Sequence, residues 1–568
     1  MGQFEDLDTS LGQLSKDRAD IWSVTSCGVT RSERAIPALI DRHAYSPATD
    51  RVRVLLVGGL SGRPGDVKVS LKAVQLFADS WGYLSSKIGL TAIPCGNPTG
   101  FAMDNGPHNG SGGVPGSGYP PDGGFFNDRE NPESRYVWRW ICYQAPDVVL
   151  EVQQEEYVVW EANAPAKGIG SVLDASQIEP DDSLLSAIAI GQPDGLGPIP
   201  GLRLAVPLGE LDEQLSRLWE SLIQRPPGAS QARRVLDKRR SRNQIEIGAD
   251  LAKTNGRTLE PLVYTQGVAI SGRLRFEEID PGCLGGIEDI DSLVYQVVSD
   301  PVQSFGTEPN SADLAGVVWA EELASLKLDG RFNDLLVTTA DYVKPRGVGR
   351  PPWPFNPQFL VEDFFMSASV LGRAFRVTKS ERYIDLLSEF LLGSGIQHES
   401  GLFPHSRRGP YHWGRGNGFA ALGMAEALTY MPLHYPARDS VLGMCHMQME
   451  ALKSLQEPSG MYLQLIDFPG SYQEFTATCM IGYSMARGIR LGWLDGSYRS
   501  VLDKAWRGIS ERVDFNGNIV DGCAGSGVMD NIRSYLDRPA NSGYDDRSGS
   551  MALWFAAEME RLYGGLTE

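Results

Sequence analysis

Residues 411–419, Tyr-His-Trp-Gly-Arg-Gly-Asn-Gly-Phe, place a flat aromatic ring, a guanidinium and a side-chain amide within five residues of one another. Glycines alternate with Trp413, Arg415 and Asn417, and glycine lets a ligand approach the backbone closely. An apolar pattern with helical spacing follows at once, at Phe419, Leu422, Ala425 and Leu428. We therefore expect this polar cluster on a loop that leads directly into a helix.

The chemistry of this cluster suits an acidic sugar. A helix N-terminus with an added arginine favours an anion, and Trp413 offers a stacking face for a sugar ring. The alternative interpretation is a glycine-rich turn with a core tryptophan and a surface arginine. Taken alone, the motif favours neither interpretation over the other.

From about residue 310 onward the sequence has helical periodicity almost throughout. The clearest apolar stripe lies within residues 363–377, at Phe364, Ala368, Leu371 and Phe375. Further helices are expected at 313–326, 331–343, 381–392, 418–430, 441–455, 477–491, 501–513 and 550–562. Helices that come in pairs joined by glycine-rich loops predict an all-α toroid of the (α/α)6 type over residues 310–568.

Residues 1–224 alternate strand-like and helix-like segments instead. The continuous apolar run at 54–57 predicts a buried strand. Other strands are expected at 90–93, 147–152 and 202–206, with helices at 67–78, 133–141 and 211–223. This alternation predicts an α/β domain with a parallel, doubly wound sheet. We expect residues 225–309 to be a connector with short strands.

Composition narrows the classes of partner. At 568 residues the chain is too long for one ordinary core, so two domains are expected. The net charge of -19 argues against nucleic acid or an anionic membrane as the main partner. One basic run, at 233–242, runs against this trend, and we interpret it as a solvated helix face.

The cysteines and the N-terminus bear on the compartment. The seven cysteines are scattered, odd in number and without a CxxC pair, which favours reduced thiols over a disulfide framework. The first residues show neither a basic start nor an apolar stretch. These features predict a cytoplasmic protein, or a secreted one from which a leader has been trimmed.

The C-terminal half, from about residue 313 to 568, resembles the unsaturated uronyl hydrolases of glycoside hydrolase families 88 and 105. Six motifs agree in order, at 360–366, 401–405, 413–418, 474–478, 487–495 and 535–539. The resemblance implies that a 4,5-unsaturated uronic acid is removed from the non-reducing end of oligosaccharides left by polysaccharide lyases. In that reaction an acid protonates C4 of the double bond, water adds at C5, and the hemiketal collapses. It implies a small acidic oligosaccharide as substrate and no cofactor.

The resemblance places the catalytic acid at one of two adjacent carboxylates. Asp363 is our first choice and Glu362 is its rival. The family's aspartate lies four residues before a methionine, and the residue four positions before Met366 is Glu362. In this chain the aspartate lies three positions before that methionine. Adjacent helical residues point about 100° apart, so the two cannot serve the same spot. A general acid that protonates carbon and then activates water is required.

The same resemblance suggests roles for five other residues. His405 would orient the substrate or the attacking water, Arg415 would bind the uronate carboxylate, and Trp413 would stack on the ring. Asn417 would either hydrogen-bond a sugar hydroxyl or cap the helix. Asp313 is the nearest candidate for a second aspartate of the family.

The N-terminal half, over roughly residues 20–220, resembles the zinc carboxypeptidase fold. A strand followed by a family motif matches residues 55–64, and Asn-Pro-Thr-Gly at 97–100 matches another. The three ligand positions then hold Ser61, Pro64 and Gln153. Zinc requires imidazole, carboxylate or thiolate ligands, so we expect a scaffold that has lost its metal.

Other functions compete with the hydration of an unsaturated uronide. The toroid could hydrolyse an intact uronide, or bind an acidic sugar without catalysis. The N-terminal domain could instead act as a peptidase, or as an esterase through Ser61, although Gly59-Leu60-Ser61-Gly62-Arg63 lacks the second glycine of a nucleophile elbow. The source polysaccharide and the oligomeric state are left open.

Overall fold

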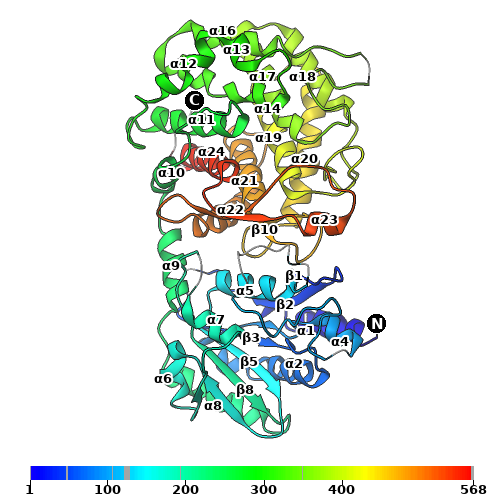
Figure 1. Ribbon diagram of the computed structural model, residues 1–568, viewed down its shortest axis with the longest axis vertical. Coiled ribbons are helices and arrows are strands. Elements are labelled where there is room, and N and C mark those ends of the chain that lie inside the picture. The colour runs from blue at the N-terminus through cyan, green and yellow to red at the C-terminus, as the bar shows by residue number, and fades with distance from the viewer. Residues whose placement is uncertain are drawn as a thin grey trace. The chain divides into compact units, whose positions relative to one another are not determined.

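The computed structural model describes residues 2–46, 49–104, 106–120, 128, 130–191, 194–347 and 349–564. The chain divides into two compact units (Figure 1). The first comprises Met1–Lys238 together with Phe468–Tyr472 and Leu536–Pro539, and the second comprises Arg239–Asp467, Gln473–Tyr535 and Ala540–Glu568.

The first unit is built on an eight-stranded mixed sheet with the order β1-β2-β4-β3-β5-β8-β6-β7. Its four central strands, β4, β3, β5 and β8, are parallel, whereas β2 and β6 join them antiparallel. The strands span Trp22–Val29 (β1), Ala35–Asp41 (β2), Val52–Gly58 (β3), Ile88–Ile93 (β4), Val148–Gln154 (β5), Val159–Ala162 (β6), Ser176–Gln177 (β7) and Gly201–Val206 (β8). The parallel α/β core that the sequence predicted is therefore present, with antiparallel strands added on both sides.

Helices cover this sheet because its central strands are apolar on both faces. In β3 every residue from Val54 to Val57 is buried, as expected for a strand covered on both sides. One core cluster joins one face of the sheet to α1 (Gly2–Asp17), α2 (Pro64–Asp79) and α8 (Leu211–Gln224), and includes Trp22, Phe77 and Trp219. The helices α5 (Pro132–Gln144) and α7 (Leu184–Ile190) contact the sheet but add no residue to that cluster.

The second unit is a ring of helices around one core. Its long inner helices contact one another in the order α11, α24, α21, α19, α17, and the short α14 closes the ring between α17 and α11. They span Tyr264–Ile279 (α11), Ser311–Leu314 (α14), Glu362–Thr378 (α17), Gly414–Tyr430 (α19), Phe475–Arg490 (α21) and Asp546–Tyr563 (α24). A closed ring of this kind confirms the predicted α/α toroid.

An outer set of helices packs against this ring. The outer helices are α10 (Gln244–Ala252), α12 (Ile290–Ser299), α16 (Gly330–Ala340), α18 (Glu381–Gly393), α20 (Arg438–Ser454) and α22 (Arg499–Glu511). Strand is scarce here and consists of β9 (Tyr462–Leu463), β10 (Gln473–Glu474), β11 (Ile519–Cys523) and β12 (Ala540–Gly543). The amphipathic stripes of the sequence correspond to this arrangement, because each outer helix has one buried face.

The prediction of a connector with short strands at residues 225–309 is wrong. No strand is found in the structure of residues 225–309; the segment carries α9 (Gln231–Arg240), α10, α11, α12 and α13 (Pro301–Phe305). The helix α11 is a member of the inner ring, and its residues from Tyr264 to Phe276 are all buried. Because its buried residues include Gln266, Arg273 and Arg275, it lacks the continuous apolar stripe by which we predicted other helices.

Several arginines of the basic run at 233–242 form ion pairs within the first or the second unit. In the first unit Arg233 contacts Asp147 at 2.6 Å. In the second unit Arg240 contacts Glu511 at 3.2 Å, and Arg242 contacts Asp250 at 2.5 Å. The run therefore has structural partners and is more than a solvated helix face.

Across the residues placed by the structure, no helix is both long and apolar enough to cross a lipid bilayer.

Candidate active site

The N-termini of the inner helices gather at one end of the toroid. The Thr265 hydroxyl at the start of α11 donates to Asp546 at the start of α24, at 2.8 Å. The Tyr264 ring packs edge-on against Phe419 near the start of α19, with ring centroids 5.7 Å apart. Helix N-termini carry partial positive charge, and carboxylates such as Glu362 and Asp546 lie at these helix starts.

A chain of three side chains lies at this end. Tyr535 contacts His405 through its hydroxyl and the ring Nδ1, at 2.7 Å, and His405 Nε2 lies 3.3 Å from Glu362 Oε1. The backbone N–H of Met529 donates to the same Tyr535 hydroxyl, so the hydroxyl hydrogen is available for Nδ1. We assign the His405 proton to Nε2 on this basis, where it donates to Glu362.

Among the three contacting side chains Tyr535, His405 and Glu362, Glu362 provides a carboxylate, and one of its oxygens has no hydrogen-bond partner among the described residues. It begins α17 and is 9% exposed. While its Oε1 faces His405, no described residue hydrogen-bonds its buried Oε2. A buried carboxylate oxygen without a partner is costly unless a ligand or a proton completes it. This oxygen is therefore the one placed to carry a transferable proton.

Asp363 has a different environment, although it is adjacent in sequence. Its Oδ1 accepts from the Ser311 hydroxyl at 2.6 Å, and its Oδ2 accepts from the Asn356 backbone N–H at 2.7 Å. Burial, together with the nearby charge of Glu362, raises the pKa of Asp363 to about 7 against these two hydrogen bonds. Both oxygens are thus held by the protein, which ties α14 and the loop before α17 to the helix start.

This environment predicts a pH-dependent stability that Asp363→Asn removes. In the folded state Asp363 keeps its proton up to about pH 7, whereas in the unfolded chain the carboxyl loses it near its ordinary pKa of 3.8. The free energy of unfolding should therefore fall as pH rises from 4 to 7, by about 4 kcal/mol from this group. We expect the stability difference between Asp363→Asn and wild type to grow over that range in denaturant titrations. A difference that stays constant from pH 4 to 8 would contradict this assignment.

Trp413 and Arg415 are turned inward, which differs from their expected roles. Trp413 is fully buried and packs against the His405 ring, with centroids 4.4 Å apart, and under the Arg415 guanidinium, at 4.8 Å. Arg415 is also fully buried and donates to the backbone carbonyls of Cys523 and Gly525. Stacking on a sugar and binding a uronate carboxylate are therefore not supported. The two residues support His405 and hold the segment after β11 in place.

Asn417 and Asp313 also have structural partners. Asn417 accepts from the backbone N–H of Phe403 at 2.9 Å and donates to the carbonyl of the same residue, also at 2.9 Å. It lies inside α19 and is not its N-cap, so it fixes the chain that leads to His405. Asp313 accepts from the Asn310 backbone N–H in a capping box at the start of α14. Neither expected sugar contact is supported.

Sequence reasoning missed two contributors to this end of the ring. Tyr535 lies in one of the six motifs, but nothing in its spacing revealed that it contacts His405. Tyr264 lay in the segment that we interpreted as a connector. Burial raises the pKa of Tyr264 to about 12, while the charges of Arg415, Arg547, Asp546 and Glu362 all act on it. The charges of these four groups therefore all act on Tyr264.

In the first unit, two of the three residues at the expected zinc-ligand positions are hydrogen-bonded to other side chains, and the third is a proline. The Ser61 hydroxyl donates to Asp66, and Gln153 donates to Glu151 at 2.8 Å. Pro64 begins α2 and has no ligating atom. Within the part of the chain that the structure describes, no three His, Cys, Asp or Glu side chains could hold a metal ion.

We predict that this unit binds no catalytic zinc, because the three expected ligand positions hold no zinc ligand and Ser61 is hydrogen-bonded to Asp66. Elemental analysis of the purified full-length chain should give well under one zinc per chain. One tightly bound zinc, lost when Ser61 and Gln153 are replaced by alanine, would contradict this prediction.

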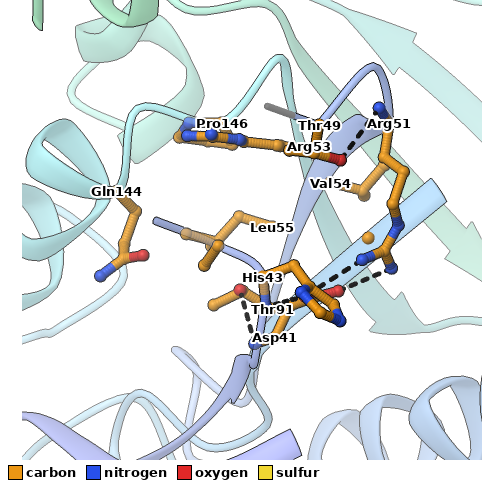
Figure 2. A pocket seen from close by; sticks show the side chains of 12 residues that line it. Asp41, His43, Thr49, Arg51, Arg53, Val54, Leu55, Thr91, Gln144 and Pro146 are labelled. Atoms are coloured by element: carbon orange, nitrogen blue, oxygen red, sulfur yellow. Dashed lines mark hydrogen bonds and ion pairs between the residues drawn. The ribbon is translucent and has the colours of Figure 1, made fainter. Parts of the chain in front are cut away.

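A small crevice lies at the other edge of the same sheet, before β3 (Figure 2). Figure 2 shows the Arg51 guanidinium directed at Asp41, to which it is bonded at 2.8 Å. The free space is about 20 Å³, which is enough for about one water molecule. This crevice is therefore too small for a sugar or a peptide, and His43 beside it lies away from Ser61.

Comparison with known proteins shows which family the toroid is similar to. Residues 353–563 match the family model of Glycosyl Hydrolase Family 88. The unsaturated rhamnogalacturonyl hydrolase YesR of Bacillus subtilis (strain 168) is 31% identical over 156 residues, which cover 27% of this chain and 43% of that protein. The chain spans about two fifths of the length of the curated relatives it matches. The family match confirms the resemblance that the motifs of the C-terminal half predicted.

Solved structures resemble each half separately. A possible member of the GH105 family from Klebsiella pneumoniae subsp. pneumoniae MGH 78578 covers 53% of this chain and 83% of its own, at 20% identity and a TM-score of 0.47. A metallo-carboxypeptidase from Burkholderia cenocepacia covers 39% of this chain and 68% of its own, at 13% identity and a TM-score of 0.31.

Proposed function

We propose that this chain is a glycoside hydrolase that removes a 4,5-unsaturated uronic acid from the non-reducing end of lyase-generated oligosaccharides, by hydration of the double bond. The observation that carries the proposal is the Glu362–His405–Tyr535 chain, which lies inside the segment that matches Glycosyl Hydrolase Family 88. The substrate class is that of the curated relative, whose name describes an unsaturated rhamnogalacturonyl hydrolase.

In the proposed mechanism Glu362 is the general acid. Its Oε2 hands a proton to C4 of the enol-ether double bond, and the resulting cation at C5 is stabilised by the ring oxygen. The carboxylate then takes a proton from water as that water adds at C5, which restores the acid. The hemiketal collapses to release the saccharide chain. A single carboxylic acid is enough for both proton transfers.

The choice of Glu362 over Asp363 rests on hydrogen bonding. Both oxygens of Asp363 accept hydrogen bonds from the protein, whereas one oxygen of Glu362 does not. The raised pKa of Asp363 favours a neutral acid, but a proton donor must first reach the reacting carbon. We therefore place Asp363 as a positioning residue that fixes the first turn of α17.

The uronate carboxylate requires a cation other than the buried Arg415. Arg547 at the start of α24 is the candidate, since its side chain is 39% exposed and lies 3.5 Å from Asp546. Its charge acts on Tyr264, as does that of Glu362. The positive ends of the inner helices would add to its attraction for the carboxylate.

The direct experiment follows the near-ultraviolet absorbance of the unsaturated uronate, which disappears on hydration. Incubation of the full chain with lyase-generated oligosaccharides should abolish this absorbance. Binding without loss of absorbance would instead favour the non-catalytic sugar-binding protein. Release of an intact uronide without any absorbance change would favour ordinary hydrolysis.

Tyr535→Phe should lower the rate of this reaction by roughly 2- to 10-fold, because one net hydrogen bond to His405 is lost. The matched control is Tyr411→Phe, since the Tyr411 ring packs on Tyr535 while its hydroxyl reaches only the Asp530 carbonyl, at 3.5 Å. Equal losses in both variants would mean that ring packing, rather than the His405 contact, matters.

An esterase in the first unit has less support. The Ser61 hydroxyl is hydrogen-bonded to Asp66, and His43 lies at the far edge of the sheet. We also propose a cytoplasmic location, which the seven free cysteines favour.

A further inference from the structure

A cavity of about 390 Å³ lies between the C-terminal part of α18 and the chain that precedes α17. Only Lys379 and Ser380 join α17 to α18, and the two helices pack together, so they run antiparallel. The end of α18 therefore lies beside the start of α17, where Glu362 is found. The volume falls within the range of small-molecule sites, roughly 300–1,000 Å³.

Three arginines gather at this cavity. Arg346 and Arg350 line it, and so does the ring of Phe359. The guanidinium of Arg407 lies over that ring, 4.0 Å from its centroid. The side chains of Arg350 and Arg407 are exposed and that of Arg346 is partly exposed, so a ligand in solution can reach all three.

The guanidiniums of these three arginines form no ion pair with any carboxylate that the structure describes. Arg346 donates to the backbone carbonyl of Phe355 at 3.0 Å, and Arg407 donates to that of Ser394 at 2.8 Å. A guanidinium has five N–H donors, so most of those in the cluster remain for solvent or a ligand. Unpaired cations of this kind stand out in a chain with a net charge of -19.

Two carboxylates bear on the charge of this arginine cluster. Glu389 lines the same cavity and is exposed. The charge of Arg346 also acts on Asp363, but the oxygens of Asp363 are hydrogen-bonded to Ser311 and to the backbone of Asn356. Three guanidiniums exceed these two carboxylates even when both are ionised, so the cluster keeps an excess of positive charge.

The arginine cluster lies close to the proposed catalytic residues. Phe359 precedes Glu362 by three residues, and Arg407 follows His405 by two. An extended chain spans at most about 3.6 Å per residue, so the Cα atoms of the first pair lie within about 11 Å and those of the second within about 7 Å. An oligosaccharide whose unsaturated end is at Glu362 is therefore long enough to place a following sugar residue at the cluster.

We propose that Arg346, Arg350 and Arg407 form a subsite for a second anionic group of the oligosaccharide, on the reducing side of the bond that is cleaved. This group is an oxyanion, either a carboxylate or a sulfate ester, because guanidiniums bind planar and tetrahedral oxyanions through paired N–H donors. The subsite rests on the proposed function, since it binds a further part of the same substrate. It would make the hydrolase select fragments that carry negative charge beyond the terminal uronate.

The test compares three unsaturated substrates by loss of absorbance: a disaccharide with a neutral second sugar, the same disaccharide with a sulfate ester on that sugar, and a tetrasaccharide with an internal uronate. In the double variant Arg350→Gln/Arg407→Gln, we expect KM for at least one charged substrate to rise roughly tenfold or more, because charge-assisted hydrogen bonds are lost. KM for the neutral disaccharide should change by less than about twofold, and kcat should stay unchanged for all three. The charged substrate that shows the effect identifies the anion as sulfate or carboxylate.

The control is Arg331→Gln at the start of α16, outside the cavity lining. Arg331 is 72% exposed and pairs only with the neighbouring Asp329, so this variant should behave as wild type with all three substrates. If the double variant does not fold, Arg350→Gln alone serves, since no described residue hydrogen-bonds that side chain. It should raise KM for the same charged substrate roughly threefold.

Equal KM changes for neutral and charged substrates, or no change for any of them, would overturn the proposed subsite. If wild type leaves the absorbance of all three substrates unchanged, the proposed function fails, and calorimetric titration with the tetrasaccharide then decides the subsite separately. Binding that is roughly tenfold weaker in the double variant would support an anion site. Equal binding by both proteins, or none by wild type, would overturn it.

Discussion

Glu362→Gln should reduce the turnover of an unsaturated uronide by roughly 100- to 10,000-fold, the usual contribution of general acid–base catalysis. Glutamine keeps the length of the side chain, and its carbonyl oxygen can still accept from His405 Nε2. It cannot supply a proton to C4. Substrate binding should therefore be retained, so that the loss falls on kcat rather than KM when absorbance is followed.

Asp363→Asn is the matched control for this variant. The asparagine carbonyl can accept from the Asn356 N–H and its amide can donate to Ser311, so the first turn of α17 should keep its place. Most of the activity should remain. If Asp363→Asn is inactive and Glu362→Gln is active, the aspartate is the acid. If both variants remain fully active, the proposed mechanism is wrong.

Glu426→Gln should destabilise the toroid by about 3–5 kcal/mol, the cost of breaking a buried ion pair on one side. Glu426 is fully buried on α19 and contacts Arg373 at 2.9 Å and Arg487 at 3.0 Å. Although burial opposes its ionisation, Arg373, Arg487 and Arg275 lower the pKa of Glu426 to about 2. Neutralising it would remove one counter-charge from each of two buried guanidiniums.

The measurement is denaturant unfolding of the toroid, compared with Glu321→Gln as control. Glu321 contacts Arg373 at 3.3 Å and Arg376 at 2.9 Å, but it is partly exposed and should cost less. The stability from Glu426 should be present above about pH 4.5, the value of a free glutamate, and be lost as pH falls toward 2. A loss below 1 kcal/mol at pH 7 would contradict a central role for Glu426.

The sequence predicted the toroid where helices carry a continuous apolar stripe, and failed where polar side chains interrupt it. Phe364 and Leu371 form a visible stripe in α17, whereas α11 buries polar residues such as Arg273, so its inner position could not be read from periodicity. In the first unit, the four strands predicted from the sequence are β3, β4, β5 and β8. These are the adjacent parallel strands at the centre of the sheet.

The sequence predicted that some of the candidate residues lie together, but not the direction of every side chain. Glu362 and His405 lie together, as collinear motifs suggested. Trp413 and Arg415 were expected to face a ligand, but a position at the start of a helix does not say whether a side chain points into the ring or into its wall. That direction depends on partners far along the chain, such as the carbonyls of Cys523 and Gly525.

The order of the inner helices has a consequence for how the chain folds during synthesis. The first long inner helix, α11, is the neighbour of the last, α24, so the ring closes between segments almost 300 residues apart. Until Asp546–Tyr563 leaves the ribosome, α11 and α21 lack the partner that covers their apolar sides. A nascent toroid would therefore expose a seam for most of its translation, and a stop codon shortly before residue 546 would yield an open ring prone to aggregation.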